Sequence, residues 1–219
     1  MKLSKDTINI FKNYASINSN LLLKEGNTIA TKSEPPTIAS EVTVAESFPS
    51  EFGIYDLNEF LGAMSLFNDP DLTFHEKYVT ITENNNTIKF YAADASILST
   101  PKKSITFPDS DVDFKLSATT LASVLRTSNI LKAGDLSFIG ENGKLILQVW
   151  DKKISTGNSY QTELGTTDKT FRINIKIDNL KLMTGDYDVS ISSRRISRFT
   201  SIGSSLVYYI AVETDSTFE

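Results

Sequence analysis

The stretch Phe52–Asp71, FGIYDLNEFLGAMSLFNDPD, carries the clearest helix signal in the chain. Asp56 can accept hydrogen bonds from the first free amide groups of a helix and Glu59 can reach back, so this capping-box spacing predicts a helix that begins at Leu57. Proline disfavours helical geometry in the preceding residue, so Asn68-Asp69-Pro70 is expected to end the helix. The apolar side chains recur at helical spacing, at Leu57, Phe60, Leu61, Met64 and Phe67.

The other side of this helix is small and polar. It carries Asn58, Gly62 and Ser65. Such a face is typical of an ordinary surface helix, and it also suits a large molecule that passes close to the protein. The sequence of this stretch alone leaves both interpretations open.

The composition is that of a soluble globular protein. The chain has 219 residues, of which 40% are hydrophobic and 22% charged, enough for one large core or two of about a hundred residues each. No run of 18 apolar residues occurs and the start MKLSKD lacks the apolar core of a signal peptide, so we expect a cytoplasmic protein. The chain has no cysteine, which excludes disulfides and thiol chemistry. The net charge of −5 argues against a generally basic nucleic-acid binder, so any basic function must be local.

The first hundred residues are expected to open with a helix. Ser4 is a good N-cap, and the helix runs to about Ile17 with an apolar stripe of Ile8, Phe11 and Ala15. Lys5 and Lys12 share another face with Asn9 and Ser16. Strands are expected at Leu21–Thr31, as a hairpin turned at Glu25-Gly26-Asn27, at Thr37–Glu46, and, beyond the central helix, at Lys77–Thr82 and Thr87–Ala93.

The same order of elements starts again after a connector. Ser99–Asp113 contains two prolines and clustered charges, which is typical of a linker. Beyond it we expect a helix capped by Ser117 with the stripe Leu121, Val124, Leu125 and Ser128, a hairpin at Leu136–Trp150 turned at Glu141-Asn142-Gly143, strands at Tyr160–Leu164 and Thr170–Ile175, a short helix at Lys176–Met183, and strands at Asp186–Ser192 and Ser205–Glu213. The repetition predicts an α+β protein of two similar domains, residues 1–104 and 114–219, joined by residues 105–113.

The sequence offers little catalytic or metal-binding chemistry. His75 is the one histidine, and no serine or cysteine nucleophile motif surrounds it. The acidic run Asp109–Asp113 resembles the start of a calcium loop, but Phe114 stands where that loop needs glycine and Thr120 where it needs glutamate. We therefore expect a protein that is not an enzyme and that uses neither a metal nor a cofactor.

Basic residues are the stronger functional lead. Each alone is an ordinary solvated residue, but together they lie on or beside the expected helices of both halves, at Lys5, Lys12, Arg126, Lys132, Lys176 and Lys181. This coincidence favours a surface that meets nucleic acid. Arg194, Arg195 and Arg198 form a second cluster in an expected hairpin loop, where they can touch phosphate or a protein partner, or keep a sheet edge soluble.

Several stretches together resemble a known family. They are Lys2–Thr7 with Lys12-Asn13, Ile17-Asn18-Ser19, Ile54–Leu66 with Asn68-Asp69, Val124-Leu125-Arg126, Asn179-Leu180-Lys181, Gly185-Asp186-Tyr187, and the ending Tyr208–Thr217. The chain resembles the sliding clamps of T-even-type bacteriophages, which are processivity factors of DNA polymerase.

The resemblance implies a DNA-clamp fold with two similar domains per subunit. Helices would line the hole of a homotrimeric ring and antiparallel sheets would form its outside. Double-stranded DNA would thread the hole without sequence recognition. An ATP-driven clamp loader would open the ring and DNA polymerase would attach by a short tail, in the cytoplasm of an infected bacterial host. Late-transcription proteins are a further partner class that the resemblance leaves open.

The resemblance also assigns residues. Lys5, Lys12, Arg126 and Lys181 match basic positions on the family's helices, whereas Lys132 and Lys176 depend on their helical positions alone. Candidates for the apolar pocket that receives the polymerase tail are Phe107, Pro108 and Tyr208. An alternative from another class is a virion or tail structural protein, an acidic, β-rich subunit whose repeat builds a lattice.

Overall fold

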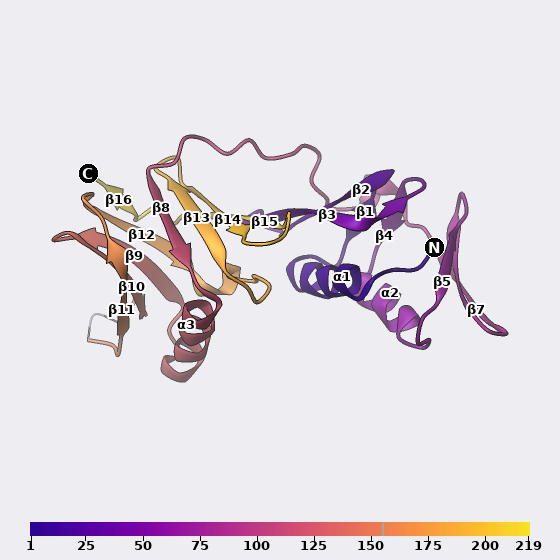
Figure 1. Cartoon of the computed structure of the whole chain (residues 1–219), viewed down its shortest axis with the longest axis horizontal. Helices are drawn as coiled ribbons and strands as arrows, with labels where there is room; N and C mark the ends of the chain where they lie inside the picture. The colour runs from indigo at the N-terminus through magenta and orange to yellow at the C-terminus, as the bar shows by residue number, and fades with distance from the viewer. Residues whose placement is uncertain (155) are drawn as a thin grey trace. The chain divides into compact units, whose positions relative to one another are not determined.

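The computed structural model describes residues 1–154 and 156–219 (Figure 1). The chain divides into two compact units, Met1–Ser104 and Ile105–Glu219. Each unit combines α-helix with antiparallel strands around its own set of buried apolar side chains, which confirms the α+β class.

The first unit, drawn from indigo to magenta in Figure 1, contains two α-helices and seven strands in the described ranges. Strands β1 and β4 pair, β2 pairs with β3, and β5, β6 and β7 form a three-stranded sheet, all antiparallel. Helix α1 packs against α2 and lies on β2 and β3. The elements are α1 (Lys5–Ile17), β1 (Leu21–Leu23), β2 (Gly26–Lys32), β3 (Ile38–Phe48), β4 (Phe52–Ile54), α2 (Leu57–Met64), β5 (Asp71–Phe74), β6 (Tyr78–Glu83), β7 (Asn86–Tyr91) and the 3₁₀ turn η1 (Ala95–Ile97).

Helix α1 begins where the sequence predicts, but it buries a different stripe. The Ser4 hydroxyl accepts a hydrogen bond from the Thr7 amide at 3.2 Å, which confirms the N-cap. The predicted stripe was partly wrong, because Phe11 is buried whereas Ile8 and Ala15 are only half-buried. The side chains that α1 buries are Thr7, Ile10, Phe11, Tyr14 and Ile17. Burial of Tyr14 is possible because its hydroxyl finds a partner, the Ser40 hydroxyl 3.0 Å away.

Helix α2 confirms the predicted start. One carboxylate oxygen of Asp56 accepts hydrogen bonds from the amides of Asn58 at 2.8 Å and Glu59 at 3.3 Å. The helix ends at Met64, ahead of the predicted stop at Asn68-Asp69-Pro70, because the amides of Leu66 and Phe67 bond three residues back, to the carbonyls of Ala63 and Met64, in the tighter pattern of a closing turn. Its outer face is exposed at Asn58, Gly62 and Ser65, as predicted.

The predicted hairpin over Leu21–Thr31 was wrong. Strand β1 pairs instead with β4, and β2 pairs with the long strand β3. Burial explains the choice, since Leu21 and Leu23 are buried beside a strand whose three residues are all buried. The strand predictions for β3, β6 and β7 hold within two residues, whereas β5 was missed.

The second unit contains one α-helix and nine strands in the described ranges. One sheet has the order β11-β10-β9-β12-β16, and the other contains β15, β14, β13 and β8 as consecutive neighbours. Helix α3 packs on β10. The elements are β8 (Val112–Leu116), α3 (Ala118–Leu131), β9 (Asp135–Glu141), β10 (Lys144–Trp150), β11 (Tyr160–Thr166), β12 (Phe171–Lys176), the 3₁₀ turn η2 (Ile177–Asn179), β13 (Tyr187–Ser192), β14 (Ile196–Ser201), β15 (Val207–Ala211) and β16 (Thr217–Phe218).

Several predictions for this unit hold. The Ser117 hydroxyl accepts from the Thr120 amide at 3.1 Å, and α3 buries Leu121, Val124 and Ser128, whereas Leu125 is half-buried. Strands β9 and β10 form the predicted hairpin, whose turn residues Asn142 and Gly143 both have positive φ, at 52° and 79°. An Asn-Gly pair adopts this geometry readily, which is why the turn was visible in the sequence.

The predicted helix Lys176–Met183 was wrong, since only Ile177–Asn179 forms a 3₁₀ turn. Buried Ile177 and Leu180 are three residues apart, a spacing that one such turn satisfies. The backbone of Met183 is bonded to side chains instead of a helix, because its amide donates to the Tyr208 hydroxyl and its carbonyl accepts from the Tyr187 hydroxyl. Strands β8, β14 and β16 were also missed.

Candidate DNA-facing helices and partner surface

The exposed face of α1 carries two unpaired cations. Lys5, Asn9, Lys12 and Ser16 are all exposed, as the sequence predicts, and they lie opposite the buried stripe of the helix. Neither Lys5 nor Lys12 forms an ion pair with any residue that the structure describes. Both ammonium groups are therefore available to an anionic ligand.

Helix α3 presents a similar face with one cation. Arg126 is exposed among small and polar neighbours, Ala122, Ser123 and Asn129, which are exposed as well. Lys132 follows the end of the helix in the left-handed conformation, with φ 53° and ψ 37°, and its side chain is exposed. Neither residue forms an ion pair in the described part of the chain.

Lys176 and Lys181 do not lie on a helix. Lys176 is the last residue of β12, and its ammonium group bonds the carboxylate of Asp135, a residue that is only 2% exposed. The attraction between these two charges holds the lysine at the sheet. Lys181 is exposed and follows the η2 turn. The sequence analysis placed both residues at a DNA surface because it expected them on a helix, and the structure does not support that reason.

The residues predicted for the partner pocket do not all meet. Phe107 is half-buried, with the Arg198 guanidinium 4.5 Å from its ring centroid and the ring of Tyr209 6.4 Å away. Pro108 follows it and is also half-buried. Tyr208 is fully buried, and its ring lies 6.2 Å from that of Tyr187.

Strand alternation explains this separation. Consecutive residues of β15 point to opposite faces of the sheet, so Tyr208 belongs to the core and Tyr209 faces the connector. Sequence reasoning did not assign Tyr209 to the pocket, and it placed Arg198 in a loop cluster that can touch phosphate or a protein partner. Tyr209 is itself largely buried, at 9% exposed. Arg198 lies in β14 rather than in the loop, and only Arg194 and Arg195 are at the turn between β13 and β14.

The described residues form no group of three or more histidine, cysteine or carboxylate side chains that could hold a metal ion. Among the described helices, none is both long enough and apolar enough to cross a membrane. His75 lies in the turn between β5 and β6, where its ring stacks on that of Tyr78 with 4.5 Å between the ring centroids.

The fold matches solved DNA clamps. A structure described as the C-terminal region of FEN-1 bound to A. fulgidus PCNA superimposes with a TM-score of 0.71 over 96% of each chain, at 12% sequence identity. Structures of the DNA polymerase III β chain are similar as well, and that from Streptococcus pneumoniae gives a TM-score of 0.67 at 13% identity over 97% of this chain and 64% of the β chain. The fold is that of the DNA sliding clamps.

Sequence comparison narrows the class to a family. The family model described as DNA polymerase processivity factor matches residues 4–100, and the model described as gp45 sliding clamp, C terminal, matches residues 112–214. The sliding clamp of Vibrio phage KVP40 is 33% identical over 97% of this chain and 99% of the relative, and that of Escherichia phage RB69 is 33% identical over the whole of both. The chain belongs to the bacteriophage sliding-clamp family of DNA polymerase processivity factors. These comparisons give no support to the virion-assembly alternative.

Proposed function

We propose that three copies of the chain close into a ring around double-stranded DNA, with α1 and α3 lining the hole. The observation that carries this proposal is the exposed face of α1, with two lysines that form no ion pair among the described residues, in a chain of net charge −5. In this arrangement Lys5, Lys12, Arg126 and Lys132 face the phosphates. Lys176 is left out because Asp135 holds it, and Lys181 stays a candidate beside the η2 turn.

Electrostatics favours such a ring over a tight complex. The screening length is about 8 Å at physiological salt, so cations on the inner helices can outweigh the more distant acidic exterior. Contacts to phosphate carry no base information, which makes the binding independent of sequence. A closed ring stays on DNA by topology, so it can slide without tight binding.

Each compact unit would be one clamp domain, residues 1–104 and 114–219, with residues 105–113 as the connector. Strand β8 begins at Val112, so the part of this connector before the strand is residues 105–111. A polymerase tail would attach at the surface of Phe107, Arg198 and Tyr209, where an aromatic ring, a guanidinium and a second ring lie together. An ATP-driven loader would open the ring, and late-transcription proteins would be further partners. The protein would act in the cytoplasm of an infected bacterium, without catalysing a reaction.

Ring closure needs one contact surface on each unit. In the first unit β7 is an end strand of its sheet, and Tyr91 on it is 67% exposed. Strand β5 at the other end is covered, because its Leu72 exchanges backbone hydrogen bonds with Met1. In the second unit β11 is the longest of the end strands, which are β8, β11 and β16, so we assign the subunit contact to the free edges of β7 and β11.

A loading assay tests the proposal. The protein, loaded by its ATPase partner on nicked circular DNA, should stay bound in moderate salt and dissociate once the circle is cut. The double variant Lys12→Glu/Arg126→Glu should load poorly while keeping its trimeric mass. The double variant Lys24→Glu/Lys153→Glu makes the same charge change at exposed residues away from the helices and should load normally. Equal loss from circular and linear DNA would refute the topological model.

A further inference from the structure

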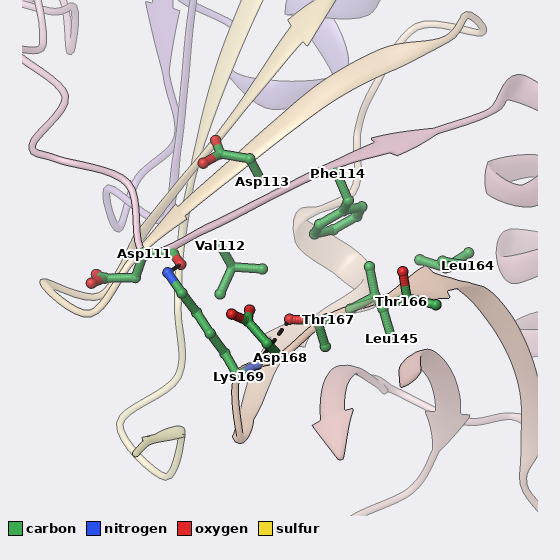
Figure 2. A pocket seen from close by; sticks show the side chains of 11 residues that line it. Asp111, Val112, Asp113, Phe114, Leu145, Leu164, Thr166, Thr167, Asp168 and Lys169 are labelled. Carbon is green, nitrogen blue, oxygen red and sulfur yellow. Dashed lines mark hydrogen bonds between the residues drawn. The ribbon is translucent and has the colours of Figure 1, made fainter. Parts of the chain in front are cut away.

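A pocket opens in the second unit between two sheet edges (Figure 2). It has a volume of about 450 Å³, within the roughly 300–1,000 Å³ typical of ligand pockets. Figure 2 shows Val112 and Phe114 projecting from β8 toward the end of β11 and the loop after it. The apolar part of the lining consists of Val112, Phe114, Leu145 and Leu164.

The strand topology creates this opening. Among the described strands β8 pairs only with β13, and β11 pairs only with β10, so each ends its sheet. Strand β11 also contains a bulge, because Leu145 faces Gly165 and Ile146 faces Glu163, which leaves Leu164 without a partner. A bulge redirects a side chain, and here the extra residue is one that lines the pocket.

The charged side chains around the opening are mainly negative. Three carboxylates, those of Asp111, Asp113 and Asp168, stand against the single ammonium of Lys169. The Asp111 carboxylate accepts a hydrogen bond from the Ser193 amide at 2.6 Å, and this bond holds its pKa below the usual value. Asp113 is exposed on the outer face of β8, whereas Val112 on the inner face is buried.

We propose that the free edge of β8 binds an extended, basic segment of a protein partner as an added strand. Alternate apolar side chains of that segment fill the pocket, and the lysine or arginine side chains between them lie outside, beside Asp113. Strand addition provides main-chain hydrogen bonds, while the pocket and the carboxylates select the side-chain pattern. This site goes beyond the proposed function and shares no residue with the surface around Phe107.

Lys169 restricts access to this edge. Its ammonium group donates to the carbonyl of Asp111, the residue directly before β8, so the side chain crosses one end of the opening (Figure 2). Lysine on an edge is a common device against unwanted strand pairing. Shortening Lys169 would free that carbonyl and remove the one cation among the residues that line the opening.

The test uses the full-length protein and a fluorescein-labelled peptide, Gly-Leu-Lys-Phe-Arg-Leu-Gly, followed by fluorescence anisotropy. Asp113→Lys and Asp168→Lys should each weaken binding by about fivefold or more, the effect of one charge pair at an edge. Lys169→Ala should strengthen binding, a gain that a folding defect cannot produce. Asp178→Lys, the same reversal at an exposed turn, should leave binding unchanged.

Control peptides separate the two features of the ligand. Replacing the lysine and arginine by glutamate, or the three apolar residues by serine, should abolish binding. Hydrogen exchange should show protection of residues 112–116 when the peptide binds. The proposal is overturned if the wild-type protein fails to bind the peptide, if Lys169→Ala weakens binding, or if the aspartate variants lose their trimeric mass, since the opening would then belong to the contact between subunits.

Discussion

Truncating Phe60 tests whether α2 holds α1 in place. Phe60 is 1% exposed, and its ring centroid lies 6.2 Å from that of Phe11 on α1 and 5.2 Å from that of Phe90 on β7. Phe60→Ala removes both ring contacts, worth about 0.5–1.5 kcal/mol each beyond their buried area, and leaves a cavity. We expect the first unit to lose about 3–5 kcal/mol of its free energy of unfolding.

Hydrogen exchange measured by mass spectrometry resolves this loss unit by unit. The α1 amides should exchange roughly 100- to 5,000-fold faster, which is the expected free-energy loss expressed as a rate ratio. The α3 amides, in the other unit, should change little. Leu66→Ala is the matched control, because Leu66 follows the same helix and is 74% exposed, so its loss should stay within about 0.5 kcal/mol.

Two results would refute this reasoning. A loss below about 1.5 kcal/mol in α1 would mean that the site collapses around the smaller side chain and that α2 does not hold α1. Equal acceleration in α1 and α3 would mean that the two units open together. The outcome bears on function, because α1 carries Lys5 and Lys12, and the orientation of its exposed face depends on how its buried stripe is packed.

Three further outcomes follow from individual contacts. Tyr14→Phe leaves the Ser40 hydroxyl without this partner and should cost about 1–2 kcal/mol in denaturant unfolding. Asp56→Ala removes the cap of α2 and should cost about 1 kcal/mol by the same measurement, with faster exchange at its first turn. Carboxyl NMR titration should give Asp111 a pKa below its ordinary 3.8. Because folding lowers this pKa, the Asp111 carboxylate stabilises the folded state at pH values above the pKa of the unfolded chain. This stabilisation is lost as the pH falls through the pKa of the folded chain.

Local signals were the ones that sequence reasoning used well. The caps Ser4, Asp56 and Ser117 each act through residues two or three positions away, so the chemistry that starts a helix is visible in the sequence. The Asn142-Gly143 turn is equally local. These signals, with the exposed lysines of α1, are where prediction and structure agree.

Sequence reasoning missed the features that depend on contacts between distant parts of the chain. Nothing near Leu21–Leu23 indicates that this strand pairs with Phe52–Ile54 rather than with its neighbour, because the preference depends on burial beside a distant segment. The failed helix at Lys176–Met183 has the same origin, since the hydroxyls of Tyr187 and Tyr208 bind the Met183 backbone from strands further along the chain. Strand alternation puts Tyr208 and Tyr209 on opposite faces of β15, but it does not say which face is the core, so the wrong tyrosine was assigned to the pocket.

Ion pairing is the property that separates one basic residue from another, and it cannot be read from the sequence. A lysine drives association with DNA by releasing counterions from the phosphates, and an ammonium already neutralised by a carboxylate has less to gain. The structure pairs Lys176 with Asp135 and Lys152 with Glu213 and Asp215, whereas Lys12 has no such partner in the described residues. In the sequence Lys12 and Lys176 are both lysines on or beside a predicted helix. In the structure only Lys12 of the two lies on an exposed helical face without a carboxylate partner among the described residues. Lys169 differs from Lys12 in a similar way, because its ammonium group already donates to the Asp111 carbonyl at the β8 edge and is therefore less available to phosphate.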